Sequence, residues 1–232
     1  MRYEAVIFDL SDTLIEYTPN YARIYGDRIR NLGYEVSDET AKEMSRAVNQ
    51  AIGEQSRREQ FGDLHLSQEQ LAALLDRTAL SCVTDIVQDA QLSMLSRIPI
   101  PLQEISIIDG AIEVLEELQR HFRLAIVSNH FAWIMNYLNE SGLSNYFEAI
   151  IISEIVGVEK PNPRILQIAL QELDLPPDKC IYVGDQPNDV LCAKQVGVDC
   201  VWIAPLDLQL PKSIPYLADY HITSVTELLN II

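Results

Sequence analysis

Short, continuous apolar runs that alternate with helical patterns are the feature that most constrains the fold of this chain. Five such runs and a weaker sixth lie at 5–8, 124–127, 149–152, 180–183, 200–203 and 220–222. A run of four apolar residues is typical of a strand that is covered on both faces, as in a parallel sheet. Helical patterns separate the later runs, at 132–141, from Asn162 and Pro163 onward, and at 224–232. The sequence therefore predicts an α/β fold with a doubly wound parallel sheet.

A block that reads as helix after helix interrupts this alternation after the first run. Apolar residues with helical spacing form one stripe, at Tyr21, Ile24, Tyr25, Ile29 and Leu32. Ser37 is a predicted N-cap that is followed by two acidic residues, and Ser67 has capping-box spacing to Gln70. The block is therefore predicted to be all-helical.

These patterns predict two domains. The α/β core is expected to comprise 1–15 and 101–232, and the inserted helical domain is expected at 16–100. Hinges are expected near 15–18 and 98–108, where the chain would pass from one domain to the other. The helical insertion would form a small second domain beside the core.

The balance of charge excludes some classes of partner. The chain has 34 acidic and 17 basic residues and a formal net charge of -17. It therefore offers no basic surface to replace the counterions of nucleic acid or to dock on anionic membranes.

No apolar run approaches the ~20 residues of a membrane span. The cysteines form no C-x-x-C pair, so we expect reduced core cysteines in a soluble, cytoplasmic protein. The oligomeric state is left open.

Polar residues follow three of the predicted strands. Asp9 ends the first, Ser128 and Asn129 end the second, and Asp185 follows the fourth. Lys160 lies in a loop just before a predicted helix. Because ligands of parallel α/β sheets bind beyond the carboxyl ends of the strands, we expect these residues to converge at one edge of the sheet.

Four stretches of the chain resemble the motifs of the haloacid dehalogenase superfamily, in the branch that carries a helical cap after the first motif. They lie at 8–14, 127–129, 160–163 and 184–189. Each is weak alone, but their order and their places relative to the strands fit the family across essentially the whole chain. The resemblance implies a magnesium-dependent phosphatase or phosphotransferase that forms an aspartyl-phosphate on Asp9. It also implies a small phosphorylated molecule as the substrate.

The resemblance further implies a role for each motif residue. Asp9 would be the nucleophile, oriented by Thr13 and offset in charge by Lys160. Ser128, the backbone N–H of Asn129 and Lys160 would bind the phosphoryl group. The ligands of Mg²⁺ would be the carboxylates of Asp9, Asp185 and Asp189 and the backbone carbonyl of Ser11. Several carboxylates at one place are stable when a cation neutralises them.

The sequence departs from phosphatases of this family at Ser11. They carry a second aspartate here, which acts as general acid on the leaving alkoxide and then as general base on water. Serine has no useful pKa near neutrality, and Asp12 does not obviously replace the missing group. General acid–base catalysis typically contributes about 10²–10⁴-fold. We therefore expect a site that binds magnesium and phosphate but hydrolyses alkyl esters slowly. The loss of rate is expected to be smallest for aryl and acyl phosphates.

Three alternatives stay open. A catalytically impaired relative would have a binding or regulatory role. A dehalogenase typically carries tyrosine at the position of Ser11 and has a less acidic last motif. A phosphonatase needs a Schiff-base lysine from the cap, and Lys42 is the lysine present in 16–100. The residues expected to touch the leaving group are Arg57, Arg58, Tyr17, His130 and Phe131.

Overall fold

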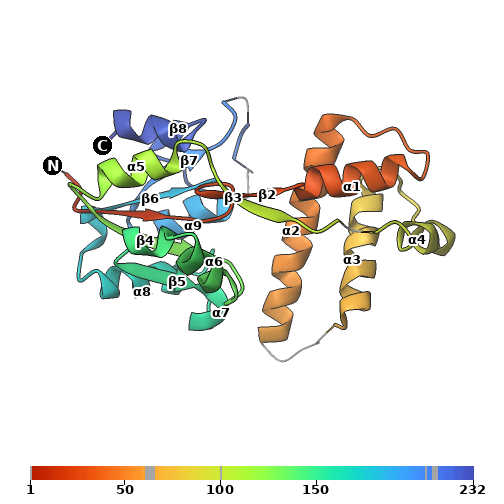
Figure 1. The fold of residues 1–232 in the computed structure, drawn as a ribbon, viewed down its shortest axis with the longest axis horizontal. Coiled ribbons are helices and arrows are strands. Elements are labelled where there is room, and N and C mark those ends of the chain that lie inside the picture. The colour runs from red at the N-terminus through yellow and green to blue at the C-terminus, as the bar shows by residue number, and fades with distance from the viewer. Residues whose placement is uncertain (1, 61–65, 100, 207, 211–213) are drawn as a thin grey trace. The chain divides into compact units, whose positions relative to one another are not determined.

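The computed structural model describes residues 2–60, 66–99, 101–206, 208–210 and 214–232 (Figure 1). They form two compact units. One unit joins Met1–Glu16 to Ile105–Ile232, and the other is Tyr17–Glu104. Each unit has a hydrophobic core of its own.

The larger unit is built on a six-stranded parallel sheet, which confirms the predicted fold class. Its strands are β1 (Ala5–Phe8), β4 (Arg123–Ser128), β5 (Ala149–Ile152), β6 (Cys180–Gly184), β7 (Asp199–Ile203) and β8 (Tyr220–Ile222). Their order across the sheet is β5-β4-β1-β6-β7-β8, and every pairing is parallel. The chain first builds the side of β4 and β5 and then returns past β1 to build the other side. The carboxyl end of β1 therefore lies at the switch point where such sheets bind ligands.

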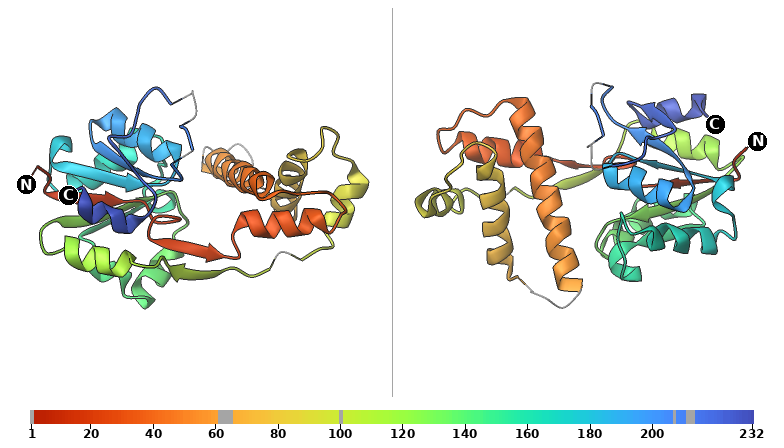
Figure 2. Two further views of the ribbon diagram at one scale, coloured as in Figure 1. Left: turned by 90° about the horizontal axis from the view of Figure 1, so that it is seen from above. Right: turned by 180° about the vertical axis from the view of Figure 1, so that it is seen from behind.

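Helices cover both faces of this sheet (Figures 1 and 2). On one face, α8 (Pro163–Glu172) and α9 (Pro187–Val196) share a buried cluster with Ala5 and Ile7 of β1. The helix α5 (Ala111–Leu118) also contributes a buried apolar side. This unit also contains α6 (Ile134–Glu140), α7 (Ser153–Val156) and the 3-10 helices η1 (Leu143–Tyr146) and η2 (Pro177–Lys179). Strands covered in this way are buried on both sides, as their apolar runs predict.

The helix starts follow the sequence signals. The Asn162 side chain accepts a hydrogen bond from the Arg164 N–H at 3.0 Å, and Pro163 is the first residue of α8. The helix predicted at 132–141 is α6, shorter by two residues at its start. Because proline has a fixed φ and no N–H, it suits the first helical position.

The end of the chain is helical, as predicted. The helix within 224–232 is the 3-10 helix η3 (Val225–Asn230). The Glu227 N–H donates to the Ser224 carbonyl at 3.1 Å, three residues back. A hydrogen bond to the carbonyl three residues back is the pattern of a 3-10 helix.

The smaller unit is all-helical between its ends. Its helices are α1 (Tyr21–Arg30), α2 (Asp38–Gln60), α3 (Gln68–Ser81) and α4 (Asp89–Leu95). The capping box between Ser67 and Gln70 is present, and Ser37 Oγ accepts from the Thr40 N–H at 3.1 Å. Its core contains Ile24, Tyr25, Ile29, Met44, Val48, Ala79, Leu80 and Leu95. The predicted apolar stripe therefore packs against this core, since Ile24, Tyr25 and Ile29 are buried in it and Tyr21 and Leu32 are partly buried against it.

A buried ion pair in this unit is not visible in the sequence pattern. Arg28 lies 2.5 Å from Asp76 Oδ1, and both side chains are nearly inaccessible. Two further N–H groups of Arg28 donate to the carbonyls of Leu95 at 2.9 Å and Ile98 at 3.1 Å. Buried charges are tolerated when each has partners of this kind. Arg28 thus ties α1 to α3 and to the end of α4.

Two short strands stand where the sequence predicts hinges. They are β2 (Ile15–Thr18) and β3 (Glu104–Ile107), and they pair in a two-stranded sheet. Neither strand is buried on both faces. A search for continuous apolar runs therefore misses them, because such runs mark strands covered on both sides.

The described residues bear on two further expectations. None of their helices is long and apolar enough to cross a membrane. The four cysteines are free of disulfides, and Cys180, Cys192 and Cys200 are buried. Burial without pairing is what we expect of reduced core cysteines.

Candidate active site

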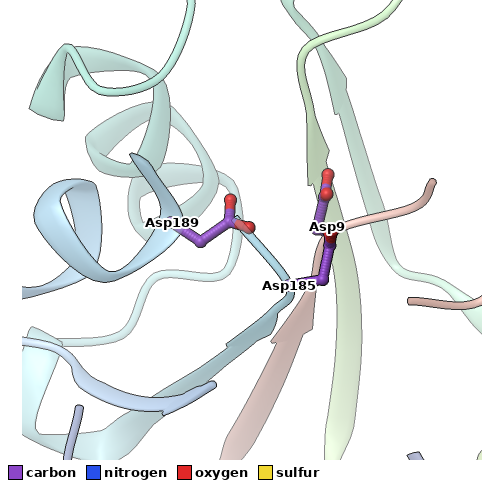
Figure 3. A group of neighbouring side chains, drawn as sticks. All are labelled: Asp9, Asp185 and Asp189. Carbon is purple, nitrogen blue, oxygen red and sulfur yellow. The ribbon is translucent and has the colours of Figure 1, made fainter. Parts of the chain in front are cut away.

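Three carboxylates meet at the carboxyl end of β1. Asp9 follows β1, Asp185 follows β6, and Asp189 lies in the first turn of α9 (Figure 3). One oxygen of each lies within 4.8 Å of the others. The Asp9 N–H donates to the Val183 carbonyl at 2.8 Å, which fixes the nucleophile candidate against β6. The sheet thus gathers residues that are far apart in the sequence.

Lys160 places its ammonium group among these carboxylates. Its Nζ donates to Asp9 Oδ1 at 2.7 Å and to Asp189 Oδ1 at 2.6 Å, and the residue is 4% exposed. Burial alone would lower the pKa of Lys160, but the charges of Asp189 and Asp9 outweigh it and raise the pKa. Lys160 is therefore a fixed cation beside Asp9.

The loop of Lys160 is held by the residue that follows β4. Asn129 Oδ1 accepts from the Lys160 N–H at 2.7 Å, and Asn129 Nδ2 donates to the Lys160 carbonyl at 2.9 Å. Ser128, the last residue of β4, is buried. The side chain of Asn129 therefore positions Lys160, a contact that the sequence analysis did not foresee. Phosphoryl binding by Ser128, by the Asn129 N–H and by Lys160 stays a prediction.

Asp189 is engaged by protein groups through both oxygens. Its Oδ1 accepts from Lys160 and lies 3.1 Å from the Tyr182 hydroxyl, and its Oδ2 accepts from the Gln186 N–H at 2.8 Å. A Cβ on Gly184 would lie 2.4 Å from Oδ2, so this position needs glycine. Burial raises the pKa of Asp189 to about 6, and Lys160 opposes the rise. Asp189 anchors Lys160, and its predicted role as a metal ligand remains untested.

Two buried oxygens at this site have no hydrogen-bond partner among the described residues. They are Asp185 Oδ1 and Thr13 Oγ1. Burial raises the pKa of Asp185 well above its ordinary value, and the charges of Asp9 and Asp189 raise it further. The other oxygen of Asp185, Oδ2, accepts from Gln186 Nε2. A buried carboxylate oxygen without a partner is costly unless a cation or a proton neutralises the group. Among the described residues, none donates to Asp185 Oδ1.

A magnesium ion would fit this need. Three carboxylates and one ammonium group leave two net negative charges, which one Mg²⁺ would neutralise. Mg²⁺ prefers a few oxygen ligands and keeps several waters. Asp9 and Asp185 would hold it, and Asp189 and the carbonyl of Ser11 are the further ligands that the sequence analysis predicts. The ion would supply positive charge for phosphoryl oxygens.

Magnesium is expected to raise the melting temperature of this protein, and Asp185→Asn is expected to remove most of that response. A ligand at 100 times its Kd adds about 2.7 kcal/mol of stability. The asparagine would lose the charge that attracts the ion. Thermal melts with and without magnesium measure the effect. Asp178→Asn, at an exposed aspartate on η2, is the control that should keep it. An unchanged response in Asp185→Asn would place the ion elsewhere.

The turn after β1 carries Ser11, Asp12 and Thr13. The Asp12 N–H donates to the Ile15 carbonyl at 2.7 Å, and Asp12 adopts a left-handed φ of 56°. Its side chain is exposed, and that of Ser11 is half-buried. Thr13 Oγ1 makes no hydrogen bond to Asp9 in the described structure. The orienting role of Thr13 therefore stays a prediction without a contact to support it.

The residues expected to touch the leaving group belong to both units. His130 and Phe131 follow Asn129, and Phe131 is exposed. Tyr17 lies on β2, and Arg57 and Arg58 lie on α2. The side chains of Arg57 and Arg58 are outside the described part of the structure. Their contact with the leaving group remains a prediction.

Comparison with known proteins places these features in a family. A sequence model of the family described as haloacid dehalogenase-like hydrolase matches residues 3–197. The glyceraldehyde 3-phosphate phosphatase of Pyrococcus furiosus is 38% identical over 96 residues, which are 39% of this chain and 38% of that protein. The ribulose-1,5-bisphosphate 5-phosphatase of Halopiger xanaduensis is 30% identical over 87% of this chain and 84% of its own length.

A solved structure agrees with the fold. The crystal structure of a HAD phosphatase from Thermococcus onnurineus matches with a TM-score of 0.60 and 26% sequence identity. The match covers 98% of this chain and 97% of that one. The similarity therefore extends over both units of the chain.

Proposed function

Because the chain belongs to the haloacid dehalogenase-like hydrolases, we propose that it is a magnesium-dependent phosphatase or phosphotransferase of a small phosphorylated molecule. Its relatives that are named as phosphatases support a phosphorylated substrate. The observation that carries the proposal is the buried, unpartnered Asp185 Oδ1 beside Asp9 and its bound Lys160. This arrangement offers a nucleophile next to a site that needs a cation. The net charge of -17 continues to disfavour nucleic acid as a partner.

Asp9 is the proposed nucleophile. One carboxylate oxygen attacks phosphorus, and the bond from phosphorus to the leaving-group oxygen breaks, which gives an aspartyl-phosphate. Water then cleaves this acyl phosphate and releases inorganic phosphate. Lys160 binds Asp9 Oδ1 at 2.7 Å and restricts the rotation of the carboxylate. Ser128 and the N–H of Asn129 bind the phosphoryl oxygens.

The departure at Ser11 limits this reaction. The leaving alkoxide needs a proton, and the water that cleaves the aspartyl-phosphate must lose one. A serine hydroxyl does neither near neutral pH, so hydrolysis of alkyl esters is slower by about 10²–10⁴-fold. Aryl and acyl phosphates have leaving groups that need no such proton. They are the preferred test substrates.

The helical unit Tyr17–Glu104 is proposed to act as a cap that selects the leaving group. In the sequence it stands between Asp9 and the other site residues, and it has a core of its own. A separately folded insertion can vary without disturbing the residues that bind the phosphoryl group. Substrate choice is therefore assigned to this unit and the transfer chemistry to the core.

Ser11 also favours a second candidate, a catalytically impaired relative with a binding or regulatory role. The cluster of Asp9, Asp185 and Asp189 opposes complete loss of function, since these carboxylates repel one another without a cation. The same cluster favours a metal-dependent reaction over dehalogenation. Lys42, which a phosphonatase reaction would need, is exposed on α2 and lies 4.0 Å from Glu39 Oε2.

A single substrate panel tests the proposal. Aryl phosphate, acetyl phosphate and a haloacetate are each incubated with the wild type, with and without magnesium. Magnesium-dependent release of phosphate from the first two is the expected result. Metal-independent release of halide would overturn it in favour of a dehalogenase. If no substrate is consumed although magnesium binds, the impaired relative is the better description.

A further inference from the structure

A buried tyrosine lies beneath the proposed nucleophile and has no role in the mechanism above. Tyr182 is inaccessible to solvent and sits on β6 opposite Ile7 of β1. Its hydroxyl accepts from Lys160 Nζ at 2.9 Å. It also lies 2.9 Å from the Val127 carbonyl and 3.1 Å from Asp189 Oδ1, to either of which it can donate. The hydroxyl thus touches groups from three different segments of the chain.

Counting protons shows what this hydroxyl does for Lys160. An ammonium group has three N–H donors and no acceptor. Lys160 Nζ has three acceptors within 2.9 Å, namely Asp9 Oδ1, Asp189 Oδ1 and Tyr182 Oη. The Tyr182 oxygen is the neutral one of the three. Without it, one N–H of a buried ammonium would lose its partner, which is costly in a site that excludes water.

The shorter of the two contacts that the Tyr182 hydroxyl can donate to, the Val127 carbonyl, links Lys160 to the predicted phosphoryl-binding strand. Val127 directly precedes Ser128 at the end of β4. A hydroxyl that accepts from Lys160 and donates to the Val127 carbonyl therefore sets the distance between the lysine and Ser128. Alignment within a fraction of an ångström matters for group transfer, because a displacement of 1 Å can cost about 10²-fold in rate.

We propose that Tyr182 is a positioning residue whose hydroxyl accepts a hydrogen bond from the third N–H of Lys160. It thereby holds the ammonium against Asp9 and at a fixed distance from Ser128. With its three protons bound to protein atoms, Lys160 acts on the reaction through Asp9. Tyr182 itself does not touch the substrate. The kinetic consequence rests on the proposed function, whereas the fixed ammonium is a property of the folded protein.

Kinetics of Tyr182→Phe test this role against a merely structural one. The variant is expected to lose about 10- to 100-fold in kcat, with KM changed by less than about twofold, because the substrate contacts remain. Tyr3→Phe is the matched control. Tyr3 precedes β1 and is also buried in the larger unit. Its hydroxyl donates to Asp199 Oδ2 at 2.8 Å. The control should keep kcat even if its melting temperature falls. Equal kcat in both variants would overturn the proposal.

A spectroscopic test needs neither substrate nor metal. In ¹⁵N-edited NMR spectra, the ammonium of Lys160 should give a slowly exchanging signal in the wild type, assigned by its loss in Lys160→Met. Tyr182→Phe should broaden or remove this signal, and Tyr3→Phe should leave it unchanged. A wild-type ammonium that exchanges rapidly would overturn the proposal, whether or not the variant folds.

The two tests distinguish a failure of the proposed function from a failure of the positioning role of Tyr182. If the wild type releases no phosphate but shows the protected ammonium and its loss in Tyr182→Phe, the proposed function fails and the positioning role stands. If the wild type is active and Tyr182→Phe retains both kcat and the ammonium signal, the positioning role fails alone.

Discussion

Replacing Asp9 by asparagine is expected to lower magnesium-dependent phosphate release to background, a loss on the order of 10⁴-fold or more. The amide oxygen carries no charge and is a poor nucleophile toward phosphorus, so no covalent intermediate forms. The hydrogen bond from the Asp9 N–H to the Val183 carbonyl does not depend on the side chain, so the end of β1 should stay in place. Steady-state phosphate release from an aryl phosphate measures the loss.

Trapping the intermediate distinguishes a lost nucleophile from a damaged site. Borohydride reduces an aspartyl-phosphate, and mass spectrometry of the peptide that contains Asp9 then shows the altered residue. The wild type should give this product during turnover, and Asp9→Asn should not. Asp178→Asn, on the exposed η2, should retain both activity and trapping. Substantial turnover by Asp9→Asn would mean that another group attacks phosphorus.

The fold could be predicted largely because its central strands are covered on both faces. Each apolar run, such as 5–8 or 180–183, coincides with a strand of the sheet. The strands β2 and β3 were missed because they lack such runs and lie at the predicted hinges. The last helix was predicted but its type was not, because apolar spacing does not tell a short 3-10 helix from an α-helix.

The convergence of the site residues could be predicted from one rule, that parallel strands present their carboxyl ends at one edge. Asp9 and Asp185 needed nothing more than their places after apolar runs. Lys160 does not end a strand, and its position depends on the side chain of Asn129. No pattern in the sequence indicates that an asparagine holds a loop that lies 31 residues away.

Contacts made by side chains across the sheet could not be predicted. In the sequence, Tyr182 is an ordinary member of an apolar run. The contacts of its hydroxyl form only when β6 lies beside β1. The alternation of side chains along a strand offers a partial signal, since Tyr182 lies two residues before Gly184, where β6 ends at the site. The pair of Arg28 and Asp76 was missed for the same reason, because 48 residues separate the partners.

The substitution Ser11→Asp is expected to raise the rate of alkyl phosphate hydrolysis by about 10²–10⁴-fold. The new carboxyl would protonate the leaving alkoxide and then remove a proton from the attacking water. The proposed metal contact at this position is the backbone carbonyl, which the substitution retains. The gain in kcat/KM, which reports the steps up to formation of the aspartyl-phosphate, should therefore depend on the leaving group. It should be large for an alkyl phosphate and small for an aryl phosphate, whose phenolate leaves without a proton. The ratio of the two kcat/KM values, wild type against variant, is the measurement.

Ser11→Asn is the matched control, because it has nearly the same shape as the aspartate but no ionisable group. It should leave both rates near those of the wild type. An added carboxylate also increases the repulsion at the cluster of Asp9, Asp185 and Asp189, so the melting temperature of Ser11→Asp should fall without magnesium and recover with it. If the wild type already hydrolyses alkyl phosphates as fast as the variant, another acid must serve in place of Ser11. Asp12, the adjacent exposed carboxylate, is then the residue to replace, and Asp12→Asn should abolish the activity that Ser11 does not explain.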